Sequence, residues 1–131
     1  MYLREEIIEK LFKSWITKDE SYFKSVFSKN AVYIESWGPY YGDLSEILIW
    51  FREWNRTNNV LAWDIKTFIH DKNISVCEWY FKCECYGKVD DFNGVTLFEF
   101  DDQNKIVFLK EFQSKLPNYR PYLDTDKYKL R

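Results

Sequence analysis

Glu35 is the residue of this sequence with the most evident capacity for chemistry. It stands two positions after Tyr33 and two before Trp37, so in an extended segment the three side chains share one face. A carboxylate held among rings loses hydration, and this loss raises its pKa toward the range of a general base. Glu35 is therefore the first candidate for a catalytic residue. The more common role for such an acid is a salt-bridged position at the rim of a fold, and that alternative stays open.

Three further acids fall on segments that read as strands. Glu78 and Glu84, six residues apart, point to the same side of one segment, and Glu111 lies in a later one. If Glu78 and Glu111 meet across a sheet, they could share a proton or orient a polar ligand. The more common arrangement is a set of charged rungs, paired with Lys82 and Lys110 on a solvated or dimer-facing surface.

Aromatic side chains make up 21% of the chain, with 6 Trp, 10 Tyr and 11 Phe. Rings leave gaps unless their shapes match, so a ring-rich shell around a curved sheet can line a cavity. Flat apolar walls with a few acids suit an uncharged or cationic, ring-containing ligand. The predicted ligand-binding residues are Tyr33, Trp37, Trp50, Trp54, Trp63, Glu78, Tyr80 and Glu111, with Trp79 as a further candidate. For each ring alone, packing in a core or on a dimer surface is the competing explanation.

Residues that bind metals are sparse. His70 is the only histidine, which excludes a site built from several imidazoles, and its place at a strand end predicts a surface position. Cys77, Cys83 and Cys85 lie on one strand face with a spacing that matches no standard zinc site, so buried free thiols are expected. No glycine-rich phosphate loop and no nucleophile elbow occur. We therefore predict no metal and no cofactor.

Length and charge restrict the class of protein. A chain of 131 residues is expected to form a single domain, residues 1–131, with a sizeable core. The net charge of −2 argues against a nucleic-acid partner, and the thinly spread basic residues of Lys115–Arg131 indicate a solvated tail. No apolar run reaches the ~18 residues that cross a bilayer, and the start lacks the pattern of a signal peptide. Together with three cysteines, these features predict a cytoplasmic protein without a membrane partner.

Hydrophobic periodicity and capping signals predict three helices in the first half of the chain. The first covers Leu3 to Ile16, the second is capped by Thr17 or Asp19 and ends at Ser28-Lys29-Asn30, and the third runs from Asp43 to Trp54. Strands are predicted at Ala31–Trp37, Val60–His70, Ile74–Tyr86, Gly94–Asp101 and Lys105–Lys115, with loops at Gly38–Gly42 and Lys88–Asn93. Alternation in Val60–His70 places Leu61, Trp63, Ile65, Thr67 and Ile69 on one side.

The segment Ile74–Tyr86 forms the centre of the predicted fold. Its odd positions from Cys77 to Cys85 are apolar, and its even positions from Glu78 to Tyr86 are polar or aromatic. A strand with two such faces belongs in a curved sheet, with one side on a core and the other partly wet. Because helices come first and strands follow, we predict an α+β fold: a cone-shaped, curved antiparallel (mixed) sheet with three helices on its concave face.

The order of these elements and several local strings resemble the nuclear transport factor 2-like superfamily, in its SnoaL-like branch. The matching strings are Phe27-Ser28-Lys29-Asn30-Ala31-Val32-Tyr33, Gly42, Glu78-Trp79, and the pair Phe100 and Ile106 around the last hairpin. The likeness covers Leu3 to Gln113. It implies a pocket between the helices and the sheet, and a homodimer packed through the outer sheet face.

The resemblance also implies a place for Glu35, at or next to the position of the base in ketosteroid isomerase-like members. The oxyanion-hole tyrosine of those members would fall near Leu11, and Val95 to Phe98 holds no carboxylic acid, so steroid isomerisation is not expected. We expect the pocket to bind a small, mostly apolar organic molecule, with catalysis unproven. The alternatives are an acid–base lyase, isomerase or cyclase that uses Glu35, and a non-enzymatic homodimeric interaction module.

Overall fold

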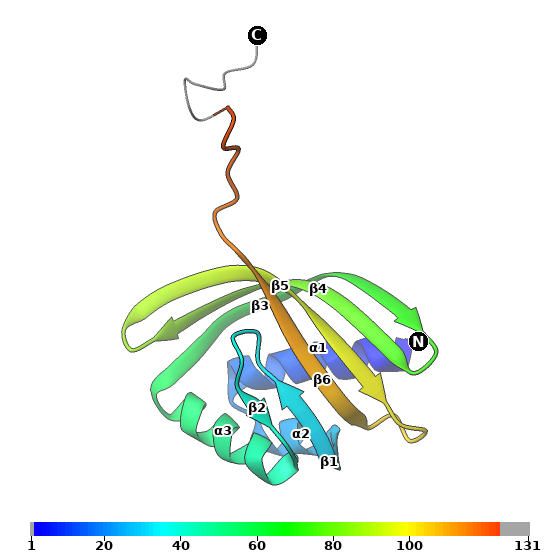
Figure 1. Ribbon diagram of the computed structural model, residues 1–131. Coiled ribbons are helices and arrows are strands. Elements are labelled where there is room, and N and C mark those ends of the chain that lie inside the picture. Colours follow the sequence, from blue (N-terminus) through cyan, green and yellow to red (C-terminus); the bar gives the residue numbers. More distant parts are fainter. Residues whose placement is uncertain (1, 124–131) are drawn as a thin grey trace.

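The computed structural model describes residues 2–123, so the basic tail residues Lys127, Lys129 and Arg131 lie outside the description. The helices are α1 (Tyr2–Thr17), α2 (Glu20–Ser25) and α3 (Leu44–Thr57). The strands are β1 (Phe27–Ile34), β2 (Tyr40–Tyr41), β3 (Asn58–Asp71), β4 (Ile74–Cys85), β5 (Lys88–Phe100) and β6 (Ile106–Lys115). The curved sheet arches over the helices (Figure 1), which confirms the predicted α+β cone.

The six strands form one mixed sheet in the order β2-β1-β6-β5-β4-β3. Neighbouring strands are antiparallel except β1 and β6, which run parallel with Tyr33 beside Leu109. The long strands β3, β4 and β5 form two successive hairpins, and these carry most of the concave wall. The parallel pairing places β6, the last strand of the chain, inside the sheet between β1 and β5.

Local signals explain where the helices begin. The side chain of Asp19 accepts a hydrogen bond from the backbone N–H of Tyr22 at 3.1 Å, so Asp19 rather than Thr17 caps α2. Asp43 caps α3 in the same way, accepting from the N–H of Glu46 at 3.0 Å. Each cap satisfies an N–H that the first helical turn leaves without a partner.

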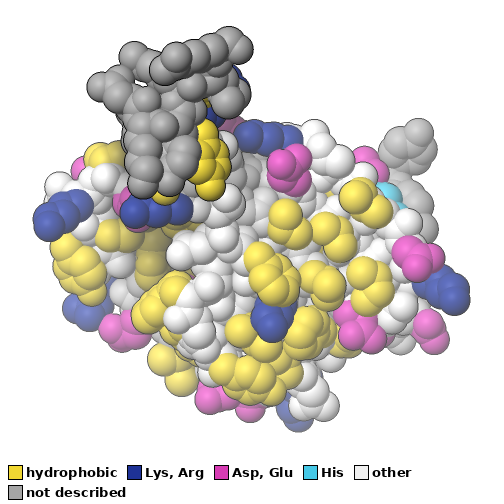
Figure 2. Space-filling model, turned by 45° about the horizontal axis from the view of Figure 1, so that its top comes forward, with side chains coloured by type: hydrophobic (Ala, Val, Ile, Leu, Met, Phe, Trp, Pro, Cys, Tyr) yellow, Lys and Arg dark blue, Asp and Glu magenta, His cyan; other side chains and the backbone are white. Residues whose placement is uncertain are grey.

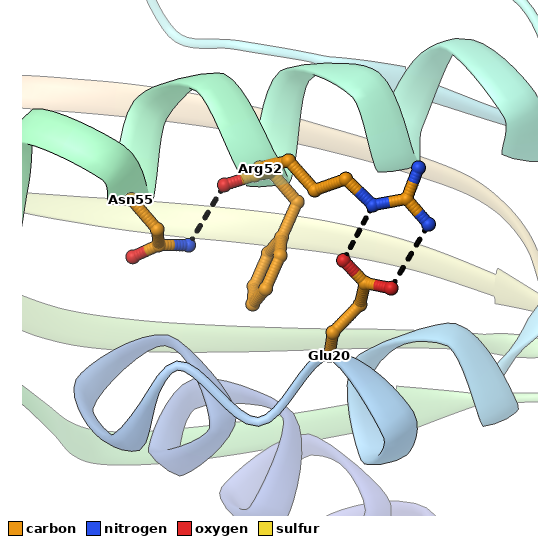
Figure 3. Close-up of polar contacts among 4 residues, drawn as sticks. Glu20, Arg52 and Asn55 are labelled. Atoms are coloured by element: carbon orange, nitrogen blue, oxygen red, sulfur yellow. Dashed lines mark hydrogen bonds and ion pairs between the residues drawn. The ribbon is translucent and has the colours of Figure 1, made fainter.

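The helices are fixed to one another and to the sheet by different interactions. On α1, Phe12 stacks on Trp63 of β3 with ring centroids 4.0 Å apart and planes 5° from parallel. Between α2 and α3, Glu20 accepts two hydrogen bonds from the Arg52 guanidinium, at 2.6 and 2.9 Å (Figure 3). The ring stack is buried while the ion pair is exposed, so packing against the sheet provides most of the stabilisation.

His70 does not lie on the surface as predicted. Its Nε2 is 2.8 Å from Oε2 of Glu5 on α1, and its Nδ1 is 2.8 Å from the hydroxyl of Ser75 on β4. Only 12% of its side chain is exposed. The residue therefore joins α1 to the sheet, and this structural role was hidden by its position beside a turn.

Two predicted strand boundaries were wrong because pairing partners decide them. β1 begins at Phe27, where helix two was expected to continue, because Phe27 pairs with Ile106 and the N–H of Ile106 donates to the carbonyl of Val26 at 2.8 Å. β5 begins at Lys88, so the predicted loop Lys88–Asn93 is strand. Its hairpin with β4 turns at Tyr86 and Gly87, both with positive φ (53° and 78°), the geometry of a two-residue hairpin turn.

The predicted alternation of Val60–His70 was also wrong. Register shifts occur between Val60 and Ala62 and between Ile65 and Thr67, and each such bulge shifts which residues face inward. Trp63 and Ile65 pack toward the core, but Leu61 and Ile69 are exposed. In the predicted loop Gly38–Gly42, Tyr40 and Tyr41 instead form the edge strand β2.

Candidate functional site

A cavity of about 320 Å³ opens between the concave face of the sheet and helices α1 and α3. All six tryptophans of the chain line it: Trp15, Trp37, Trp50, Trp54, Trp63 and Trp79. Tyr33, Phe81 and Phe92 complete the aromatic wall. The volume is at the lower end of the ~300–1,000 Å³ range of ligand pockets, so the cavity suits a small organic molecule.

Three carboxyl groups border the cavity, and two of them, those of Glu111 and Glu35, each accept a hydrogen bond from a tyrosine. The hydroxyl of Tyr33 donates to Oε2 of Glu111 at 2.5 Å, and the hydroxyl of Tyr41 donates to Oε2 of Glu35 at 2.7 Å. None of the ion pairs that the structure describes involves either acid. The salt-bridged role that the sequence left open for Glu35 is therefore not observed among residues 2–123.

The sheet register places Glu111 on the concave side. Thr96 on β5 pairs with Glu111 on one side and with Cys77 on the other, so Glu111 shares its face with the apolar row of β4. Tyr33 reaches it from β1, the strand beside β6. The Glu111 carboxyl is thus held at the back of the cavity by regular strand geometry.

Glu35 reaches the cavity from a turn and not from a strand, because β1 ends at Ile34. Its N–H donates to the carbonyl of Pro39 at 2.9 Å, and its own carbonyl accepts from the N–H of Gly38 at 3.2 Å. This turn leaves Trp37 72% exposed at the mouth of the cavity. The predicted common face of Tyr33, Glu35 and Trp37 is therefore interrupted, although all three border the cavity.

Burial changes the protonation of both acids. It raises the pKa of Glu111 to about 8, with the nearby Glu35 carboxylate adding to the rise and the Tyr33 hydroxyl opposing it. Burial also raises the pKa of Glu35, while hydrogen bonds from Tyr41 and Trp37 act against the rise. The pKa values of Tyr33 and Tyr41 are raised as well, chiefly by burial, so both remain hydroxyl donors at neutral pH.

Two predicted ligand-binding residues lie on the opposite side of the sheet. Glu78 pairs with Val95 and is exposed, whereas Tyr80 donates from its hydroxyl to Oδ2 of Asp91 at 2.8 Å. Because side chains alternate along β4, both point away from the face that carries Trp79. Glu78 and Glu111 therefore do not meet across the sheet.

The structure brings several unpredicted residues to the cavity. Trp15 was assigned only to the helix stripe, and Asp90 and Phe92 fell in the predicted loop. Tyr41, which lay in another predicted loop, lines the neighbouring hollow and donates a hydrogen bond to Glu35. One sequence signal could have placed Asp90 and Phe92 in a strand. A two-residue hairpin turn at Tyr86-Gly87 implies that the next strand begins at Lys88. Cys83 and Cys85 also line the cavity, with sulfurs 3.3 Å apart, and burial raises the pKa of Cys83 to about 12.

A second hollow of about 380 Å³ lies beside the first and shares Glu35, Trp37, Trp50 and Trp54 with it. Its only basic lining residue is Arg56, which is ion-paired with Glu53 at 3.0 Å.

Among residues 2–123, no group of His, Cys, Asp and Glu is arranged to hold a metal ion. No helix in that range is long and apolar enough to span a membrane.

A curved mixed sheet with three helices on its concave side and rings around the hollow defines the nuclear transport factor 2-like class. The chain belongs to the SnoaL-like domain family of that class, whose sequence profile matches residues 8–109. This confirms the resemblance that the sequence suggested. No match was found among curated proteins.

Solved structures with low sequence identity share the fold. One is a hypothetical protein with a ketosteroid isomerase-like fold from Catenulispora acidiphila, in complex with trimethylamine, with 15% identity, TM-score 0.74, and coverage of 83% of this chain and 85% of that one. Another is an LEH-like epoxide hydrolase from M. tuberculosis, with 13% identity, TM-score 0.76 and coverage of 85% and 82%. A third is a protein of unknown function with a cystatin-like fold from Xanthomonas campestris, with 14% identity, TM-score 0.71 and coverage of 86% and 91%.

Proposed function

We propose that the protein binds a small, mostly apolar organic molecule in the cavity between its helices and its sheet. The observation that carries this proposal is the hollow of about 320 Å³ walled by all six tryptophans. A purely structural module has no need of such a space, because voids cost packing energy. The trimethylamine complex of the Catenulispora protein supports small-molecule binding within this fold.

Intrinsic tryptophan fluorescence tests this proposal directly, because every tryptophan borders the cavity. A panel of small aromatic compounds such as indole and 2-naphthol should give a saturable change in emission. Trp54→Leu should weaken the binding, whereas Tyr80→Leu, which removes a ring from the outer sheet face, should leave it unchanged. A panel without any saturable response would favour the alternative, a non-enzymatic interaction module.

Acid–base catalysis is a second candidate, and the pair of tyrosine-bonded carboxyls favours it. Glu111, with a pKa of about 8, holds its proton at neutral pH and could donate it, while Glu35, in its ionised form, could accept one. A lyase, isomerase or cyclase that removes a proton from a carbon atom or a hydroxyl group needs one side chain to accept that proton and another to donate one. In this scheme Glu35 is the catalytic base.

Hydrogen–deuterium exchange at the α-carbon of a small cyclic ketone measures proton abstraction without knowledge of the natural substrate. NMR should show exchange above the buffer rate, and Glu35→Gln should slow it by about 10²-fold or more. Tyr80→Phe on the outer face is the control and should exchange at the wild-type rate. An exchange rate in Glu35→Gln equal to that of the wild type would show that Glu35 is not the catalytic base.

We also propose that the protein forms a homodimer through the outer face of its sheet. That face carries an apolar patch, formed by Ile69, Val76, Val95, Leu97, Phe108 and Phe112. Ile69 and Phe112 are 63% and 47% exposed, and Figure 2 shows hydrophobic side chains gathered over the strands. Contiguous apolar surface of this kind is typical of protein interfaces.

A cytoplasmic location is proposed as well. It is supported by the three cysteines, all of which are free thiols, including Cys83 and Cys85 with sulfurs only 3.3 Å apart. Thiols so close together persist where glutathione and thioredoxin keep them reduced. Finding the protein in the cytosolic fraction of its source cells would support the location, and a secreted form would contradict it.

A further inference from the structure

The charges around the cavity are all of one sign. Glu35, Asp90 and Glu111 line it, and no Lys, Arg or His is among its lining residues. The basic residue of the neighbouring hollow, Arg56, is held by Glu53. Tyrosine hydroxyls donate hydrogen bonds to Glu111 and Glu35, but a hydroxyl carries no charge to balance either carboxyl once that carboxyl is ionised. The cavity therefore has a deficit of positive charge.

The walls of the cavity provide a second attraction for a cation. The face of an aromatic ring carries negative electrostatic potential, which is largest for tryptophan. Trp50 contacts both acid-bonded tyrosines, with its ring centroid 4.8 Å from that of Tyr33 and 4.6 Å from that of Tyr41. Ring faces and carboxyls are thus gathered in one part of the cavity. Alkylammonium groups bind to such sites through their polarised methyl groups.

We propose that the ligand of this cavity is a small organic ammonium ion. The ionised carboxyls of Glu35 and Glu111 provide its counter-charge, and the tryptophan faces surround its alkyl groups. This inference rests on the proposed binding function and specifies the chemical class of the ligand. A neutral apolar guest would use the rings alone and leave the carboxyls without a counter-charge.

Choline and 3,3-dimethyl-1-butanol form a matched pair of probes, since they share shape and hydroxyl group and differ in charge. Isothermal titration of the full chain at pH 8.5 should give binding of choline at least about tenfold tighter than binding of the alcohol. Glu111→Gln, which keeps the side-chain shape, should remove most of this preference. Glu78→Gln, an acid-to-amide change on the outer face, is the matched control and should retain it.

The outcomes separate this inference from the binding function on which it rests. If the alcohol or neutral aromatic compounds bind as tightly as choline, the cavity binds small molecules but the ammonium assignment is wrong. If no compound binds, neutral or charged, both proposals fail. A choline preference that Glu111→Gln and Glu35→Gln leave intact would also overturn the assignment, because residues other than these two acids would then bind the positive charge of choline.

Discussion

At the scale of single residues, the surroundings of Glu111 have the largest consequences for protonation, and through it for binding and stability. Its carboxyl lies among aromatic rings and accepts a hydrogen bond from the hydroxyl of Tyr33 at 2.5 Å. The nearby carboxylate of Glu35 disfavours its ionised form by charge repulsion. A carboxyl in these surroundings is held protonated above its ordinary pKa because the ionised form lacks compensation. A rise in pH through about 8, or a cation bound beside it, will therefore favour the ionised form of this residue.

The affinity for a permanently charged cation should rise with pH. Binding of choline favours ionised Glu111, whose pKa in the free protein is raised to about 8, so the affinity should increase about tenfold from pH 7 to pH 9 and level off above. Glu35 also faces the site, and the hydroxyls of Tyr33 and Tyr41 stay protonated over this range because their pKa values are raised. Isothermal titration at several pH values measures the trend. Affinity independent of pH in wild type would contradict it, and Glu111→Gln should flatten the curve.

The same pKa shift predicts a change in stability. Between the ordinary carboxyl pKa of 4.5 and the folded value of about 8, the folded state binds the proton that the unfolded state has lost. Stability should therefore fall as pH rises through this window, and Glu111→Gln should remove the fall. At pH 9 we expect the variant to be more stable by about 1–3 kcal/mol, less than the full shift implies because the side chain keeps some contact with solvent. Urea denaturation at pH 5 and pH 9 tests this, and equal differences at both pH values would contradict it.

Sequence reasoning could identify acids and rings as candidates but not their partners. Glu35 and Glu111 were both identified, yet Glu111 was paired with Glu78, because nothing local shows which face of β4 meets the hollow. The register with β5 decides that, and register is set by contacts far apart in the chain. Tyr41 was invisible as a partner of Glu35 because its segment resembled an ordinary loop.

At the scale of elements, prediction succeeded where a single segment contains its own signal. The amphipathic stripe of α1, the Asp43 cap of α3 and the alternation of β4 each follow from spacing within a dozen residues. The errors fell where a distant strand decides the outcome. Phe27 is strand because β6 pairs with it, and the two bulges of β3 follow from its fit to β4.

Gly94 is the point at which β5 allows the large ring of Trp79 to lie flat on the sheet. A Cβ at this position would stand 2.2 Å from Cη2 of Trp79 and 2.5 Å from the carbonyl oxygen of Phe112. Trp79 is 1% exposed and its indole donates to the hydroxyl of Thr96 at 2.8 Å, so the ring cannot withdraw without losing that bond.

Gly94→Ala should therefore reduce the free energy of unfolding by about 2–3 kcal/mol, the cost of forcing extra atoms into a packed core. The displaced Trp79 ring should also intrude on the cavity and weaken ligand binding. Chemical denaturation and the fluorescence titration measure the two effects separately. A variant as stable as wild type would show that the sheet and the ring adjust more freely than this geometry implies.

At the scale of the whole molecule, the two faces of the sheet differ in character. The concave face bears the cavity with its acids and tryptophans, while the outer face bears the apolar patch that includes Val95, Leu97 and Phe112. Strand alternation allows both, because neighbouring residues on one strand point to opposite sides. Substitutions one residue apart should consequently affect the proposed ligand binding and the proposed assembly independently.

Assembly through the outer face should be abolished by one charge at its centre. Leu97 lies between Val76 and Lys110 on the neighbouring strands, and in a two-fold interface a glutamate there would be buried in both copies. Sedimentation equilibrium should give twice the chain mass for wild type and a single chain mass for Leu97→Glu. Ile49→Glu is the matched control, since Ile49 is an apolar residue of α3, 58% exposed and on the helix side of the sheet (Figure 1), and this variant should remain dimeric. A wild-type monomer at micromolar concentration, or a Leu97→Glu protein that still sediments as a dimer, would show that the patch has another role.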